Sequence, residues 1–352
     1  MRGGGARALP RPLHRVIDVL VAGGGPAGLA AAVHAALAGL ETVVVEPRAT
    51  PVDKACGEGV MPSGVAALRA LGVEVAGHPL RGIRYVDGPR RVEADFRGGT
   101  GLGVRRTALH AALHRRAAEA GVRFAPGRVG AVVQDADGVT AGEWRARWLI
   151  AADGLHSPLR RALGLDLPAR PAARYGLRRH FRVRPWSDHV EVHWSRHGEA
   201  YVTPVGEELV GVAVLSRERR GYDAHLTAHP ALAFLSGAAP ASAVRGAGPL
   251  LQRTRARTAG RVLLVGDAAG YVDALTGEGV ALALATAEAA VRCLAAGRPS
   301  AYEAAWRRLT RRHRVLTHAL VRACRHPAGS GLVVPAARAL PRVFAGVVRA
   351  LQ

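Results

Sequence analysis

The most constraining feature of the sequence is a glycine-rich turn that joins a strand to a helix. Residues 16–22 form a short β-branched run, which is typical of a buried parallel strand. Gly23, Gly25 and Gly28 follow at the G-x-G-x-x-G spacing and open an Ala- and Leu-rich helix. A lone G-x-G-x-x-G is weak evidence, but its place between a strand and a helix predicts a dinucleotide site in a Rossmann-like α/β fold.

Each part of this segment has its own physical role. Gly23 permits the tight turn, Gly25 lets backbone N–H groups approach a pyrophosphate, and Gly28 lets the helix pack closely on the strand. The helix N-terminus adds free N–H donors and partial positive charge, which suit a diphosphate. Glu46 ends the next strand roughly 20 residues further on, where we expect its carboxylate to bind the adenosine ribose. Arg48 follows Glu46. Its side chain either folds over the adenosine or is solvated like an ordinary loop arginine.

Length and cysteine content narrow the class of protein. The chain has 352 residues, enough for one or two domains with a sizeable core. No run approaches the roughly 18 uninterrupted apolar residues of a membrane span. Residues 1–15 lack the apolar segment of a signal peptide and predict a disordered tail. Cys56, Cys293 and Cys324 imply no disulfide framework, so we expect a cytoplasmic location.

The formal net charge of +22 raises nucleic acid and anionic membranes as partners. Lys54 is the only lysine, and the arginines are spread along the chain in small pairs. Such a spread, with abundant Ala and Gly, is typical of biased codon usage. We therefore expect no nucleic-acid partner, although the charge favours acidic substrates. The pairs are Arg105 and Arg106, Arg115 and Arg116, Arg160 and Arg161, Arg178 and Arg179, and Arg219 and Arg220.

Later segments of the chain predict a second domain, built on an antiparallel sheet. Polar and apolar residues alternate in residues 80–98, and residues 173–215 contain three or four strands with hairpin turns. Thr107 is a candidate N-cap of an amphipathic helix. Ser157, followed by Pro158 at the first helical position, starts another helix. Two further helices are expected at residues 223–236 and 280–296, and an Arg-rich amphipathic one at residues 301–325.

The C-terminal residues 330–352 are apolar and basic, and they suit covering the core, binding a partner or contacting a membrane surface. We expect them to cover the core. His189, His193 and His197 suggest a metal site by their spacing, but apolar residues alternate with them, which is the period of a strand. At about 3.3 Å per residue, neighbours in this series lie roughly 13 Å apart. We therefore expect no metal site.

Three elements follow one another in an order that resembles the FAD-dependent aromatic hydroxylase superfamily, the group A flavin monooxygenases. They are the glycine fingerprint, an Asp-Gly turn after a strand, and a Gly-Asp turn before a Gly-Glu-Gly segment, at residues 23–46, 153–154 and 266–279. The superfamily also contains geranylgeranyl reductases and flavin halogenases. The likeness covers residues 16–296. It implies a Rossmann-like (GR2-type) FAD-binding domain, an antiparallel β-sheet substrate domain and C-terminal helices.

The resemblance implies a division of the chain and a set of FAD ligands. The expected FAD-binding domain comprises residues 16–78, 99–168 and 250–297, the substrate domain residues 79–98 and 169–249, and the helical C-terminal segment residues 298–352. The pyrophosphate is expected at Gly23, Gly25, Pro26, Ala27 and Gly28.

The remaining ligands come from later in the chain. Arg106 matches a family Arg that contacts the cofactor, and Val129 lies where a backbone pair brackets the adenine. Asp267 is expected to bind the ribityl chain. Gly279 is expected to bring a helix N-terminus to the flavin pyrimidine edge, where it stabilises the negative charge of reduced flavin. Asp153 belongs to a motif linked in the family with FAD and NAD(P)H.

Three activities are consistent with this resemblance. The expected one is a monooxygenase that takes electrons from NAD(P)H, bound transiently, and hydroxylates a small aromatic or polyketide-like molecule with O2. The alternatives are a reductase of isoprenoid double bonds and a non-catalytic flavoprotein or electron carrier. Prenyl reductases carry the motif Tyr-x-Trp-x-Phe-Pro, in which Tyr201 and Thr203 here replace Trp and Phe. A halogenase needs a dedicated Lys near its substrate. Because Lys54, the only lysine, lies in an early loop, we do not expect halogenation.

The loop Cys56-Gly57-Glu58-Gly59 is expected near the flavin. Its thiol is either a redox or proton-transfer group or a small packing residue, and no catalytic residue is assigned. Since hydroxylation by a flavin oxidant requires no protein thiol, we predict the packing role. The substrate is expected to be aromatic or lipid-like, with contact to a membrane surface left open.

Overall fold

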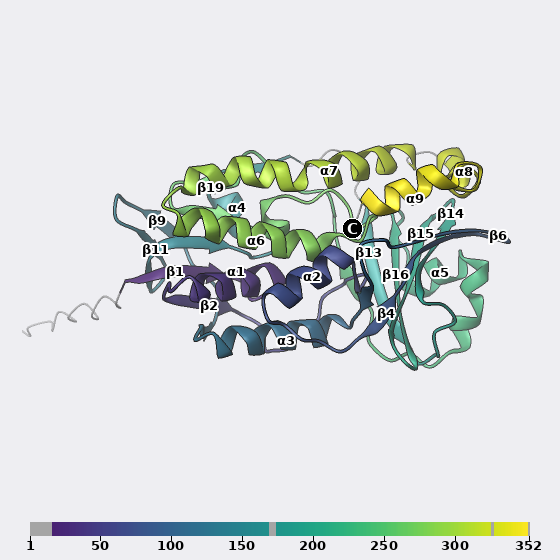
Figure 1. Ribbon diagram of the computed structural model, residues 1–352, viewed down its shortest axis with the longest axis horizontal. Helices are drawn as coiled ribbons and strands as arrows, with labels where there is room; N and C mark the ends of the chain where they lie inside the picture. The colour runs from purple at the N-terminus through teal and green to yellow at the C-terminus, as the bar shows by residue number, and fades with distance from the viewer. Residues whose placement is uncertain (1–15, 169–173, 325–326, 351–352) are drawn as a thin grey trace, which may run out of the picture.

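The computed structural model describes residues 16–168, 174–324 and 327–350, and the predicted tail at residues 1–15 lies outside them. Figure 1 shows a parallel sheet and its helices in one half of the molecule and an antiparallel sheet in the other. The long helix α7 (Tyr302–Ala323) runs along both halves. The predicted fold class is therefore confirmed.

The first sheet is built around β1 (Ile17–Ala22), which pairs in parallel with β2 (Thr42–Glu46) and β11 (Trp144–Ala151). Its other strands are β8 (Arg123–Pro126), β9 (Val132–Gln134), β10 (Val139–Ala141), β19 (Thr258–Ala259) and β20 (Val262–Leu264). Val19 and Val21 are fully buried, as expected for a strand covered on both faces. The order β19-β20-β11-β1-β2-β8 places the carboxyl ends of β1 and β11 together, with Glu46 next to them.

Helices α1 (Pro26–Leu37), α2 (Pro62–Ala70), α3 (Arg106–Glu119), α4 (Pro158–Ala162) and α6 (Gly279–Ala295) lie in the same half of the molecule. The helix start at Ser157 is confirmed, because its side chain accepts the Arg160 N–H at 2.9 Å. The N-cap prediction at Thr107 is wrong. Helix α3 begins at Arg106, two residues earlier than a cap at Thr107 implies, and there the Glu58 carboxylate accepts the Arg106 N–H at 2.8 Å and makes a local cap unnecessary.

The second sheet has the order β17-β13-β16-β15-β14-β5-β6. Its strands are β5 (Gly82–Asp87), β6 (Arg90–Asp95), β13 (Tyr175–Phe181), β14 (His189–Ser195), β15 (Gly198–Gly206), β16 (Leu209–Ser216) and β17 (Arg245–Ala247). All neighbours are antiparallel except β5 and β14, which pair in parallel. The exception is possible because about a hundred residues of chain separate the two strands, ample for a crossover connection.

The helix predicted over residues 223–236 is divided into α5 (Tyr222–Thr227) and a 3₁₀ helix, Pro230–Gly237. Pro230 causes the division, because it lacks an N–H and disfavours helical geometry at His229. Short strands complete the fold: β3 (Gly59–Val60), β4 (His78–Leu80) and β7 (Gly101–Gly103) form one sheet, and β12 (Asp166–Leu167) pairs with β18 (Arg253–Thr254).

The strand interpretation of the three histidines is confirmed for β14, and each histidine has its own acid. His189 pairs with Asp95 at 2.8 Å, His193 with Glu191 at 3.0 Å, and His197 with Glu218 at 3.0 Å. Within the described ranges, no group of three His, Cys, Asp or Glu side chains could hold a metal ion.

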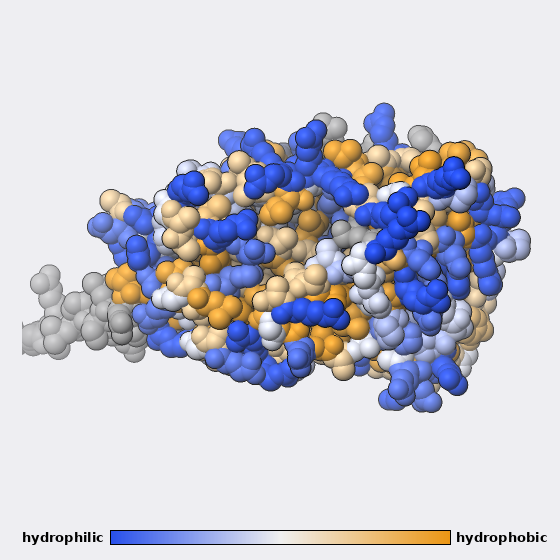
Figure 2. Space-filling model, viewed as in Figure 1, coloured by the Kyte–Doolittle hydropathy of each residue, from blue (hydrophilic) through white to orange (hydrophobic). Residues whose placement is uncertain are grey.

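Two C-terminal helices, α8 (Pro327–Ala339) and α9 (Pro341–Ala350), cover the second sheet. Val334 and Val348 are buried there, and the Phe344 ring lies 4.7 Å from the Tyr85 ring on β5. In the described part of the chain, no single helix is long and apolar enough to cross a membrane; only the pair Gly329–Ala339 and Pro341–Ala350, bent by 106°, passes together. Figure 2 shows hydrophilic residues scattered over one face with apolar patches between them.

Candidate flavin-binding site

A cavity of about 710 Å³ lies between the two halves of the molecule. Its walls come from the start of α1, the loop at residues 54–59, the turn at residues 153–156, the second sheet, and the start of α6. The structure thus brings together most of the predicted cofactor ligands along one cavity. These are Gly25, Pro26, Ala27, Arg48, Arg106, Asp267 and Gly279.

The fingerprint glycines divide into packing positions and open ones. Gly23 has a φ of 103°, and a Cβ there would lie 2.5 Å from the Ala152 carbonyl oxygen. A Cβ at Gly28 would lie 1.9 Å from the Gly23 oxygen, so any side chain would separate α1 from β1. Gly25 and Gly279 instead face free space, where the nearest atom to a Gly25 Cβ is Arg106 Nη2 at 3.9 Å. The two open glycines leave room for a ligand against two helix N-termini.

Glu46 lies at the end of β2 and faces the glycine turn. Its Oε2 accepts the Gly24 N–H at 2.8 Å, and its Oε1 accepts the Arg48 Nε–H at 2.7 Å. Burial acts to raise the pKa of Glu46, but the hydrogen bonds from Arg48 and Gly24 outweigh it and lower the pKa. The carboxylate is therefore ionised and fixed in place.

Val129 does not line the cavity. It lies in the loop after β8, partly buried against the core. Because β8 pairs with β2 next to Glu46, this loop is near the expected adenosine end. Its contact with adenine stays a prediction.

Asp267 and Lys54 face the cavity from opposite segments. Burial raises the pKa of Asp267, and the charges of Lys54 and Arg106 offset part of this effect. Burial also lowers the pKa of Lys54, with Arg48 and Arg106 adding to the shift. Lys54 Nζ lies 3.1 Å from where a Cβ of Gly154 would stand. Lys54, Arg48 and Arg106 thus bring three cationic groups near the Asp267 carboxylate on the cavity wall, a set suited to a diphosphate with hydroxyl groups.

The two carboxylate oxygens of Asp153 differ in their hydrogen bonding. Its Oδ2 accepts the Leu159 N–H at 3.0 Å, whereas its buried Oδ1 has no partner in the described residues. Burial raises the pKa of this carboxyl. An unpartnered buried oxygen beside the cavity fits a missing hydrogen-bond donor such as a ligand hydroxyl.

Arg160 was not predicted as a site residue, because the sequence placed it among the scattered arginine pairs. It is fully buried and joins the two Asp-containing turns. Its guanidinium donates to the carbonyl oxygens of Leu155 at 3.0 Å and Ala268 at 3.2 Å, and to Asp166 at 2.7 Å. A buried charge with this many acceptors holds both turns in one arrangement.

A second unpredicted group lies beneath the Cys56 loop. Glu58, buried with a φ of 62°, accepts a hydrogen bond from His180 Nε2 at 2.5 Å. Arg178 on β13 donates to the Lys54 carbonyl oxygen at 2.9 Å and pairs with Asp53. The only sequence signal was the polar character of these residues within a strand-like pattern, which does not identify partners more than a hundred residues away.

The two residues that depart from the prenyl reductase motif hold the cavity loops. Tyr201 donates its hydroxyl to the Leu275 carbonyl oxygen at 3.0 Å, and Thr203 donates to the Gly57 carbonyl oxygen at 2.8 Å. Burial raises the pKa of Tyr201 well above its usual value. The Cys56 thiol lines the cavity, and burial raises its pKa too, so it is a neutral thiol.

A family model described as the FAD binding domain matches residues 16–309. The chain belongs to this family. The open glycines, the cationic wall and the orphaned Asp153 oxygen fit FAD, whose pyrophosphate Gly25 and Arg106 would hold and whose ribityl chain Asp267 would bind. The prediction of an FAD-dependent oxidoreductase is confirmed at this level.

Several relatives that match most of the chain are reductases. A menaquinone reductase of Mycolicibacterium smegmatis is 31% identical over 338 residues, covering 84% of this chain and 80% of the relative. Digeranylgeranylglycerophospholipid reductase 1 of Methanothermobacter thermautotrophicus is 29% identical, covering 75% and 73%. The 12-dehydrotetracycline 5-monooxygenase/anhydrotetracycline 6-monooxygenase of Streptomyces rimosus is 35% identical, but the match covers only 43% of this chain and 33% of the relative.

The fold also matches solved flavoenzymes. The flavin-dependent brominase Bmp2 superposes with a TM-score of 0.81 at 17% identity, covering 96% of this chain and 93% of that one. At this identity the likeness concerns the fold alone.

Proposed function

We propose that this protein is an FAD-dependent reductase that hydrogenates a carbon–carbon double bond in the isoprenoid chain of a lipid-like substrate. The relatives that match most of the chain support this choice over the expected hydroxylation, because the monooxygenase match covers less than half of it. We further propose NAD(P)H as the reductant.

The observation that carries the proposal is the apolar half of the cavity. Side chains of the second sheet and neighbouring loops face it, at Met61, Leu155, Leu177, Val190, Leu215 and Leu250. The hydroxyls of Tyr201 and Thr203, which also line it, are already bound to backbone oxygens. Burial keeps Tyr201 protonated, so this tyrosine is unsuited to deprotonating a phenol. An apolar chain fits such a surface without losing hydrogen bonds.

Bound FAD supplies the hydride-transfer chemistry. The chain would position it: Gly25 and Arg106 would hold the pyrophosphate, Asp267 would hold the ribityl chain, and the N-terminus of α6 at Gly279 would stabilise negative charge on the reduced ring. Thr203 fixes the loop of Cys56 through the Gly57 carbonyl oxygen, and Tyr201 fixes the loop before Gly279. The apolar side chains exclude water from the reacting double bond.

The test separates reduction from hydroxylation. FAD-loaded protein is reduced anaerobically with dithionite and mixed with a prenyl quinone or a digeranylgeranyl phospholipid. Reoxidation of the flavin with gain of two hydrogens in the isoprenoid chain, and not at the quinone ring, supports the proposal. Product that contains an added oxygen atom from O2, with no anaerobic turnover, would instead establish a monooxygenase. Flavin that neither substrate class reoxidises would favour an electron carrier.

A further inference from the structure

A second cavity of about 550 Å³ lies beneath α7, on the other side of the loop that holds Asp267. Its walls come from residues 251–257, residues 266–273, α6 and α7. The two cavities share four wall residues, namely Asp267, Tyr271, Gly279 and Ala283. A ligand in the second cavity would therefore lie directly beside the flavin site.

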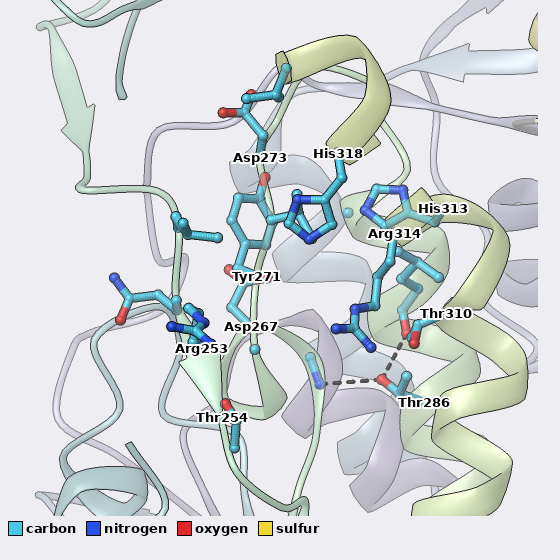
Figure 3. A pocket seen from close by; sticks show the side chains of 18 of the residues that line it. Arg253, Thr254, Asp267, Tyr271, Asp273, Thr286, Thr310, His313, Arg314 and His318 are labelled. Carbon is cyan, nitrogen blue, oxygen red and sulfur yellow. Dashed lines mark hydrogen bonds between the residues drawn. The ribbon is translucent and has the colours of Figure 1, made fainter. Parts of the chain in front are cut away.

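Several arginines that face this second cavity lack a carboxylate partner among the described residues, although one of them, Arg253, donates to the Pro168 carbonyl oxygen at 3.3 Å. Among the described residues, Arg253, Arg314 and Arg322 line it and have no carboxylate partner. Figure 3 shows Arg253 on one side of the hollow and Arg314, with His313 and His318, on the other. Three guanidinium groups without counter-charges around one space create a strong positive potential.

The carboxylates near the second cavity already have cationic partners or face cations elsewhere. Asp273 and Glu199 both contact the buried Arg174, and Arg257 pairs with Glu303 at 3.0 Å. Asp267 faces Lys54 and Arg106 on the flavin side. The unpaired arginines thus give this cavity a net positive wall.

A buried hydroxyl and an aromatic ring complete the site. Thr254 is 8% exposed, and its Oγ1 lines the cavity without a hydrogen-bond partner in the described residues. Leaving a buried hydroxyl unpaired is costly unless a ligand satisfies it. The Trp306 ring supports two guanidinium groups, Arg257 at 3.8 Å and Arg314 at 5.3 Å from its centroid, which restricts their motion.

We propose that this second cavity binds the phosphate or diphosphate group of an organic ligand used in the reaction. Arginine suits phosphate oxygens because its planar fork donates two hydrogen bonds at once. Three unpaired cations match a group with two or three negative charges better than a single carboxylate. The ligand is either the substrate, through a phosphorylated end, or the dinucleotide reductant, through its phosphates. The substrate alternative rests on the proposed function.

The first experiment measures the site without turnover. Inorganic pyrophosphate is titrated into FAD-loaded protein by calorimetry, for the parent and for Arg314→Gln, Thr254→Val and Arg311→Gln. Arg311 is an exposed arginine of the same helix that does not line the cavity, so it is the matched control. We expect Arg314→Gln to weaken binding about tenfold to a hundredfold, Thr254→Val to weaken it less, and Arg311→Gln to leave it within about twofold.

Absence of pyrophosphate binding by the parent, or equal losses in Arg314→Gln and Arg311→Gln, would overturn the proposal. Because this titration needs no substrate, its result is independent of whether the protein is a reductase.

The second experiment identifies the ligand by KM. If Arg314→Gln raises KM for NADPH while dithionite-driven turnover is unchanged, the phosphates belong to the reductant. If it raises KM for a prenyl diphosphate but not for the corresponding prenyl alcohol, they belong to the substrate. Loss of pyrophosphate binding with neither KM changed would mean that the site binds inorganic anions only, and would refute an organic ligand.

Discussion

His180 Nε2 lies 2.5 Å from Oε2 of Glu58, and this hydrogen bond joins the cofactor loops to the second sheet. Arg178 Nη1, which can only donate, lies 3.2 Å from His180 Nδ1, so Nδ1 is the acceptor and Nε2 carries the proton. The other Glu58 oxygen accepts the Arg106 N–H. One carboxylate therefore holds both the sheet and the first residue of α3, whose side chain faces the FAD cavity.

Substituting Glu58→Gln should weaken both contacts. The amide of Gln has one oxygen that can accept a hydrogen bond instead of two. Either His180 Nε2–H or the Arg106 N–H therefore loses its acceptor in a buried environment. We expect a loss of about 1–3 kcal/mol in the free energy of unfolding, with weaker FAD binding. Urea denaturation and flavin fluorescence titration measure the two effects. Glu93→Gln, which breaks an exposed pair with Arg84, is the control and should cost less than about 1 kcal/mol. Equal, small effects in both variants would show that the two contacts of Glu58 do not stabilise the fold or the FAD site.

Asp267→Asn should separate stability from cofactor binding. Burial raises the pKa of Asp267 in the folded protein, so the folded state binds more protons than the unfolded state above pH 3.8. The apoprotein should therefore lose stability from this group as pH rises through the folded-state pKa. The neutral amide removes that loss, and the variant should be more stable than the parent at pH 7. FAD affinity should fall about tenfold to a hundredfold through the lost charged acceptor. Unchanged affinity would show that Asp267 does not bind the ribityl chain.

His110 on α3 should make the apoprotein acid-sensitive. It is 1% exposed, neither ring nitrogen has a hydrogen-bond partner among the described residues, and burial followed by the charge of Arg106 lowers its pKa from 6.5 to about 4. Between these values the unfolded state binds more protons, so stability falls as pH falls from about 6.5 to about 4, by roughly 3 kcal/mol. His110→Leu should flatten this part of the profile, measured by urea denaturation at a series of pH values. A variant with the parent's slope would mean that other groups cause it.

Cys56→Ser should retain FAD binding and most turnover. Burial raises the pKa of the Cys56 thiol, so little thiolate is present at neutral pH, and its Sγ accepts a weak hydrogen bond from the Glu58 N–H at 3.4 Å. We expect at most a tenfold loss in kcat from altered packing, on the order of 1.4 kcal/mol. A thousandfold loss with normal FAD binding would show that the thiol takes part in proton transfer to the double bond.

Arg160 and Arg178 illustrate where prediction from sequence failed. Both belong to arginine pairs that we attributed to biased codon usage, yet both are buried and bind segments more than a hundred residues away. Their neighbours Arg161 and Arg179 are more exposed. A paired arginine carries no local mark of burial, because its environment depends on which distant carbonyls and carboxylates the fold brings to it.

The glycine fingerprint could be inferred from the chain because its constraints are local: the turn at Gly23 and the contact of Gly28 with the Gly23 oxygen involve residues only a few positions apart. The strand period of His189 and His193 is likewise a property of neighbouring residues. The cavity beneath α7, with Arg253 facing Arg314, depends on how two distant segments pack. The positive wall of this cavity and the burial of the Thr254 hydroxyl arise only when the chain folds, because burial and proximity between distant residues come from tertiary packing.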